Sequence, residues 1–84
     1  MLVPTEALTL KQFLLRQRVL QLYREFFRAT KQISEESNRK EVQDWIRSDF
    51  KNKKNEKDEY AIKLHIQNGR LALRELKSNI AMAK

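Results

Sequence analysis

The residues of this sequence that could do chemistry are few. There is no cysteine, one histidine (His65) and one glycine (Gly69), so a thiolate nucleophile, a multi-ligand metal site and a glycine-rich phosphate loop are all missing. Asp44 and Asp49 stand five positions apart, a spacing that does not make them neighbours on a helix. The sequence therefore predicts neither an enzyme nor a metal protein. His65, next to an apolar stripe, is expected to be a packed or hydrogen-bonded structural histidine.

Charge is the chemical feature that stands out. Eighteen Lys and Arg against eleven Asp and Glu give a formal net charge of +7. Such a balance favours an acidic partner, which can be nucleic acid, an anionic membrane or an acidic protein surface. One arginine is unusually placed: at 100° per residue, Arg16 falls within the apolar arc of its helix. An unpaired buried guanidinium would be costly, so we expect Arg16 at an edge where an acidic group can reach it.

The element that positions Arg16 is a first helix, expected over about residues 9–30. Thr9 or Thr5 is a suitable N-cap, and nothing interrupts the helix before Thr30. Its apolar arc consists of Leu15, Val19, Leu20, Leu22, Tyr23, Phe26 and Phe27. A looser group at the N-terminal end, Leu10, Phe13 and Leu14, spreads beyond that arc.

Two further helices are predicted. Asn38 and Glu41 have capping-box spacing, and Val42, Trp45, Ile46 and Phe50 then recur at helical spacing, which predicts a helix over about 38–51. After a charged connection, a long helix over about 58–83 carries a coiled-coil-like stripe: Ile62, Ile66, Gly69, Leu73, Leu76 and Ile80. Gly69 in this stripe either lets two helices approach closely or leaves a void. A second row, Tyr60, Leu64 and Leu71, would be exposed to solvent.

These elements predict an all-α protein with a single domain spanning residues 1–84, folded as an antiparallel up-down-up three-helix bundle. A domain this small buries too little surface to be more than marginally stable alone. No apolar run reaches the roughly 18 residues of a membrane span, and the N-terminus lacks the features of a secretory signal. The basic first third is similar to an uncleaved mitochondrial targeting segment, but a basic amphipathic helix is equally common as a plain structural element.

Leu22, Tyr23 and Arg24 spell LYR on the first helix, and Arg47 and Phe50 form Arg-x-x-Phe on the second, followed by a basic cluster. With the short length and the excess of cations, this pattern resembles the LYR-motif family of small mitochondrial three-helix proteins, over almost the whole chain. The resemblance implies an LYR-type bundle located in the mitochondrial matrix. It also implies a binding partner, the mitochondrial acyl carrier protein, whose acidic surface docks on basic residues of the family.

By position, the docking cations implied by the resemblance are Arg16, Arg47, Lys51 and Lys54, although the register leaves open whether Lys53 or Lys54 makes the last contact. The chain needs no cofactor of its own, because the partner supplies an acyl-phosphopantetheine whose acyl chain inserts between the helices. Burial of each CH2 contributes about 0.8 kcal/mol, so a long acyl chain could act as a removable strut in a weak core. The expected walls of this acyl-chain tunnel are Leu22, Phe26, Trp45, Ile46, Phe50, Ile66, Gly69, Leu73 and Leu76.

The function expected from the resemblance is that of a non-enzymatic adaptor that supports assembly of a larger client complex, with respiratory complex I as the expected client. Two apolar groups outside the core are candidate surfaces for this client: Tyr60, Leu64 and Leu71 on the third helix, and Leu10, Phe13 and Leu14 at the start of the first. Two other hypotheses remain. One is a basic accessory protein of the mitochondrial ribosome that contacts RNA, although the acidic residues that interrupt its basic loop argue against direct nucleic-acid binding. The other is a membrane-surface helix formed by residues 8–28.

Overall fold

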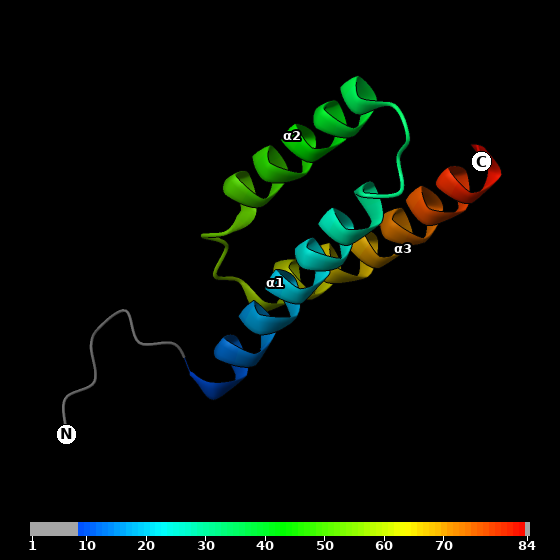
Figure 1. Ribbon diagram of the computed structural model, residues 1–84. Helices are drawn as coiled ribbons and strands as arrows, with labels where there is room; N and C mark the ends of the chain where they lie inside the picture. Colours follow the sequence, from blue (N-terminus) through cyan, green and yellow to red (C-terminus); the bar gives the residue numbers. More distant parts are fainter. Residues whose placement is uncertain (1–8, 84) are drawn as a thin grey trace.

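A computed structural model describes residues 9–83, and these residues form three helices (Figure 1). They are α1 (Leu10–Thr30), α2 (Glu36–Lys53) and α3 (Glu59–Ala83). α1 and α3 run in the same direction, and α2 runs antiparallel to both (Figure 1). The predicted all-α, up-down-up three-helix bundle is therefore confirmed. No strand occurs between residues 9 and 83.

A capping box fixes the start of α1. The Thr9 hydroxyl accepts a hydrogen bond from the backbone N–H of Gln12 at 3.1 Å, and the Thr9 backbone N–H donates to the Gln12 side chain at 3.1 Å. Two backbone donors that would otherwise lack a partner are satisfied in this way. Of the two N-caps expected from the sequence, Thr9 is used, and Thr5 lies outside the described residues.

α2 begins earlier than the sequence pattern predicts, and Asn38 as its N-cap is wrong. The helix starts at Glu36 after an N-cap at Glu35 that makes no side-chain capping bond. Its first turn is held instead by the backbone, where the N–H of Arg39 donates to the carbonyl of Glu35 at 3.0 Å. The guanidinium of Arg39 also donates to the carbonyl of Ile33 at 3.0 Å and so ties the preceding connection to the helix.

The core is built around α1, which packs against both other helices. Buried apolar residues come from all three helices: Leu15, Leu22, Tyr23, Phe26, Ala29, Ile46, Ile66 and Leu73. By contrast, no Cα atom of α2 comes within 8 Å of a Cα atom of α3. The bundle therefore has two packed helix pairs and one side, between α2 and α3, that backbone packing does not close.

Gly69 permits the close approach of α1 and α3. A Cβ atom added at this position would lie 2.5 Å from Leu22 Cδ2, well inside van der Waals contact. Of the two roles expected for Gly69, the structure shows the close approach, and the side chain of Leu22 fills the space beside it.

Large apolar side chains remain exposed where the sequence predicts them. Tyr60, Leu64 and Leu71 on α3 are 73%, 43% and 51% exposed, and the group at the start of α1, Leu10, Phe13 and Leu14, is also exposed. None of the helices in the described part of the chain is long and apolar enough to cross a membrane.

Candidate functional site

The hydroxyl of Tyr23 links all three helices. From α1 it donates a hydrogen bond to Asp49 of α2 at 2.5 Å, and it lies 2.8 Å from Nε2 of His65 on α3. Because its one hydrogen is given to Asp49, the tyrosine oxygen accepts from His65, which requires the Nε2–H tautomer. The Tyr23 ring also packs edge-on against Phe50 of α2, with centroids 4.9 Å apart. This Tyr23 cluster is the polar connection between α2 and α3.

The protonation states of the cluster follow from its burial and its partners. Burial, the hydrogen bond to Asp49 and the charge of Asp49 all raise the pKa of Tyr23 above its ordinary range. Burial acts to raise the pKa of Asp49, but hydrogen bonds from Tyr23 and Lys53 outweigh it, and the net shift is downward. Burial and the nearby charge of Lys53 lower the pKa of His65, although Asp49 opposes this. At neutral pH the cluster therefore holds a neutral tyrosine, a carboxylate and a neutral imidazole.

Most residues expected to line an acyl-chain tunnel lie together inside the bundle. Leu22, Phe26, Ile46, Ile66 and Leu73 are buried, and Phe50 and Leu76 are half-buried and pack against the core. Gly69 lies against Leu22. These side chains pack against one another, so the residues lie together as expected. The acyl-chain tunnel itself remains a prediction.

Trp45 is the exception, and its expected place on an interior wall is wrong in this structure. Its side chain is 60% exposed. Trp45 lies one helical turn before Asp49, on the edge of α2 that faces α3. Because α3 does not pack against that edge, the indole has no second helix to cover it.

The cations expected to dock a partner are all exposed. Arg47, Lys51 and Lys54 follow one another at i, i+4 and i+7 and share one side of α2. Arg47 pairs with Asp44 at 3.1 Å, and its guanidinium lies 5.2 Å from the ring centroid of Phe27 on α1. Arg16 lies on the α2-facing side of α1, seven positions before Tyr23. We call Arg16, Arg47, Lys51 and Lys54 the α1–α2 edge.

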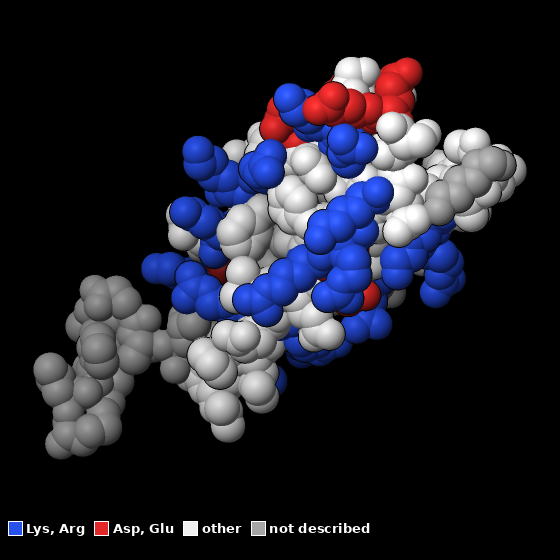
Figure 2. Space-filling view, in the orientation of Figure 1, with Lys and Arg blue, Asp and Glu red and all other residues white. Residues whose placement is uncertain are grey.

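Lys and Arg side chains spread over the face of the molecule in Figure 2, and acidic side chains gather over the N-terminal end of α2. The ion pairs within the chain distinguish Lys53 from Lys54, the two lysines between which the sequence pattern did not decide. Lys53 forms an ion pair with Asp49 at 3.0 Å, so its ammonium is already engaged by the Tyr23 cluster. Lys54 makes no ion pair within residues 9–83. Lys54 is therefore the lysine better placed to meet a partner.

Sequence reasoning missed Asp49 as a site residue. In the sequence it reads as one more acidic residue near a basic segment, yet it accepts from Tyr23 and pairs with Lys53. Its position, three residues after the buried Ile46, was the available signal, because it places the carboxylate near the inner face of α2. No group of three or more potential metal ligands occurs within residues 9–83.

Comparison with known proteins decides the family. Residues 17–75 match the family described as Complex 1 protein (LYR family). The chain belongs to the LYR family. Proteins of this family are generally mitochondrial and act as adaptors without catalysis. The matched segment contains the whole Tyr23 cluster and Arg47, whereas Arg16 immediately precedes it.

Individual LYR-family relatives cover nearly the full chain. This chain is 48% identical over 82 residues to LYR motif-containing protein 2 of Rattus norvegicus, and the match covers 98% of this chain and 93% of the relative. LYR motif-containing protein 2 of Xenopus laevis is 45% identical over 82 residues, covering 98% and 94% of the two chains. The Homo sapiens relative of the same name is 40% identical over 82 residues, covering 98% and 93%. No solved structure gives a significant match.

Proposed function

We propose that this LYR-family protein is a non-enzymatic adaptor of the mitochondrial matrix that binds acylated acyl carrier protein. In this proposal the acyl chain inserts between the helices, and the partner's acyl-phosphopantetheine supplies the only prosthetic group. The adaptor then supports assembly of a respiratory complex, for which complex I is our choice of client.

The observation that carries the proposal is the absence of close backbone packing between α2 and α3. A chain entering between two tightly packed helices must first break their interface, whereas here no backbone contact joins α2 to α3. The Tyr23 hydroxyl links the two helices through its bonds to Asp49 and His65. An exposed indole, Trp45, already stands on the edge of α2 that faces α3. An acyl chain placed there would cover Trp45 and add apolar contacts that α2 lacks.

The α1–α2 edge supports docking of an acidic partner. Arg47, Lys51 and Lys54 lie in the C-terminal half of α2 or just after it, and the net charge of +7 steers negatively charged proteins toward the molecule. Arg47 would exchange its exposed pairing with Asp44 for the partner's carboxylates, which costs little because exposed ion pairs are weak. Arg24 of the LYR motif points outward, and we expect it to contribute less than Arg16, Arg47 and Lys54.

The direct test is co-expression of this chain with mitochondrial acyl carrier protein, followed by purification and mass spectrometry of the carrier's prosthetic arm. We expect the two proteins to copurify, with a long acyl group on the carrier. Reversal of charge at Arg47 and Lys54 to Glu should abolish copurification, and the same change at the exposed Lys31 and Lys40 serves as a control with equal net charge. Failure of the unaltered chain to copurify, or equal loss in both variants, would contradict the proposal.

A further inference from the structure

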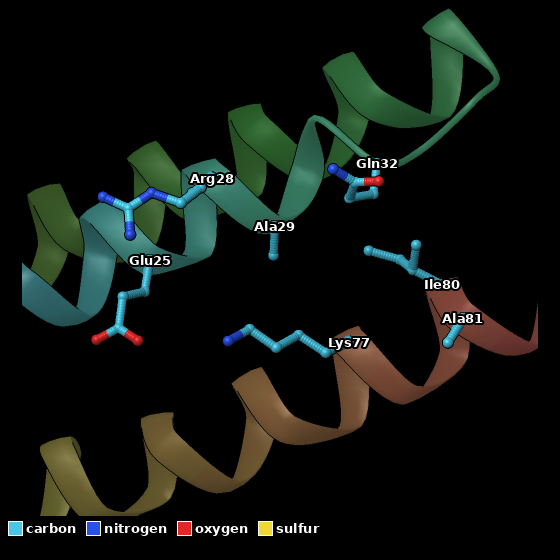
Figure 3. A pocket seen from close by; sticks show the side chains of 7 residues that line it. All are labelled: Glu25, Arg28, Ala29, Gln32, Lys77, Ile80 and Ala81. Carbon is cyan, nitrogen blue, oxygen red and sulfur yellow. The ribbon is translucent and has the colours of Figure 1, made fainter.

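A pocket of about 400 Å³ lies between α1 and α3 near their C-terminal ends, and none of its lining residues belongs to the Tyr23 cluster or the α1–α2 edge (Figure 3). Ala29 of α1 and Ile80 and Ala81 of α3 give it an apolar part. Figure 3 shows Glu25, Arg28 and Lys77 gathered at the other end. A volume in this range suits a small ligand or a large apolar side chain. We call this feature the seam pocket.

Cations extend from the seam pocket along α3. Lys63, Arg70, Arg74 and Lys77 occur at i, i+7, i+11 and i+14, which places them in one row on the helix. All four are exposed, and none forms an ion pair within residues 9–83. Ala81, four residues after Lys77, continues the row into the pocket. The α3 row is therefore a line of positive charges that ends at the apolar part of the seam pocket.

The seam pocket and the α1–α2 edge lie on different sides of α1. At 100° per residue, Glu25 projects about 180° around the helix from Arg16. The α2 helix contacts α1 through Tyr23 and Phe27, on the Arg16 side. A molecule bound in the seam pocket therefore leaves the α1–α2 edge free.

We propose that the α3 row and the seam pocket bind an acidic amphipathic helix of a second protein partner. Its carboxylates meet the unpaired cations of the row, and one large apolar side chain enters between Ala29 and Ile80. Helix-in-groove binding combines these two terms, with charge setting orientation and apolar burial adding affinity. Nucleic acid fits less well, because none of the residues within 9–83 that line the pocket is an aromatic that could stack on a base. The proposal rests on the adaptor function but not on its contact with the carrier.

A synthetic peptide of about five helical turns, with leucines on one face and glutamates flanking them, is a suitable probe. Binding is measured by fluorescence anisotropy near physiological salt against three variants. Arg74→Glu with Lys77→Glu reverses the row, and Ala81→Phe fills the pocket without changing charge. Lys51→Glu with Lys54→Glu is the matched control, because each double reversal lowers the net charge from +7 to +3.

We expect the row reversal and the pocket-filling variant each to weaken peptide binding at least tenfold, while the matched control weakens it by less than threefold. Copurification with acyl carrier protein should show the reverse pattern, with loss in the Lys51 and Lys54 variant only. The two proposals therefore fail separately. Equal weakening by both double reversals, unchanged binding to the Ala81→Phe variant, or tighter binding of an RNA oligonucleotide to the row than of the peptide would overturn the inference.

Discussion

The two helices that pack on α1 are attached in different ways. α3 is held by close backbone approach, with the Leu22 side chain seated against Gly69 and Leu73 buried nearby. α2 approaches α1 closely but not α3, and the hydrogen bonds of the Tyr23 hydroxyl to Asp49 and His65 link it to α3. From this difference we infer that α1 and α3 form a fixed platform, and we propose that α2 is the helix that moves when a ligand enters.

Disrupting the packing between α1 and α3 should have the largest effect on the free energy of unfolding. Leu22→Ala removes a side chain that is only 4% exposed and leaves a cavity beside Gly69. Buried Leu→Ala changes typically cost about 2–5 kcal/mol, a large share of the stability of so small a domain. Urea unfolding should show a loss near the middle of this range. A loss below about 1 kcal/mol would mean that the α1–α3 seam is not the rigid part of the molecule.

Removing the Tyr23 hydroxyl should loosen α2 selectively. Tyr23→Phe keeps the ring against Phe50 but removes one of the two side-chain donors to the half-buried Asp49 and leaves only Lys53. We expect a loss of about 1–2 kcal/mol, together with faster hydrogen exchange in α2 than in α3. Tyr60→Phe, at a tyrosine that is 73% exposed, is the matched control and should change neither quantity. Uniform acceleration over all three helices would argue against a separately attached α2.

The same cluster predicts how stability depends on pH. The folded-state pKa of His65 is lowered, so its contribution is present above the unfolded value of about 6.5 and is lost as pH falls through the lower folded value. The folded-state pKa of Asp49 is also lowered, so a further loss follows in acid, below about pH 4. The folded-state pKa of Tyr23 is raised, so its contribution is present below about pH 10 and is lost above it.

Unfolding free energy measured across pH should therefore be greatest between about 6.5 and 10. Tyr23→Phe should remove the alkaline loss that belongs to this residue, and His65→Gln should flatten the decline near pH 6. If the loss of unfolding free energy at alkaline pH is the same in the Tyr23→Phe variant, groups other than Tyr23 cause it.

A double-mutant cycle at the platform gives the smallest expected effect. Gly69→Ala should gain about 0.8–1 kcal/mol in helix propensity but lose about 1–3 kcal/mol from overpacking against Leu22. We expect a net loss of about 1 kcal/mol in the unaltered chain. In the Leu22→Ala background the contact is gone, so the same change should become stabilising in urea unfolding. A stabilising Gly69→Ala in both backgrounds would show that the seam tolerates a side chain.

The sequence predicted the helices and their buried faces well, because apolar periodicity decides which face of each helix is buried. It placed Leu22, Ile66 and Leu73 in the interior correctly. It failed at Trp45, because a helical pattern does not reveal that α3 keeps its backbone away from α2. It failed at Asn38, because backbone and loop contacts, here those of Arg39, can start a helix without a side-chain cap.

The Tyr23 cluster could be anticipated only in part. The LYR motif pointed to Tyr23, and Arg-x-x-Phe pointed to Phe50, which packs on it. The partners of the hydroxyl, Asp49 and His65, lie 26 and 42 positions away in the sequence. Their meeting depends on the register between three helices, which short sequence patterns do not specify.

The central claim is that an acyl chain joins α2 to the platform formed by α1 and α3. Hydrogen exchange of this chain, compared in complexes with acylated and with unacylated acyl carrier protein, tests it most directly. We expect slower hydrogen exchange in α2 around Ile46 and Phe50 when the carrier is acylated, with little change where α1 and α3 meet around Gly69. Equal exchange of α2 in the two complexes would contradict it.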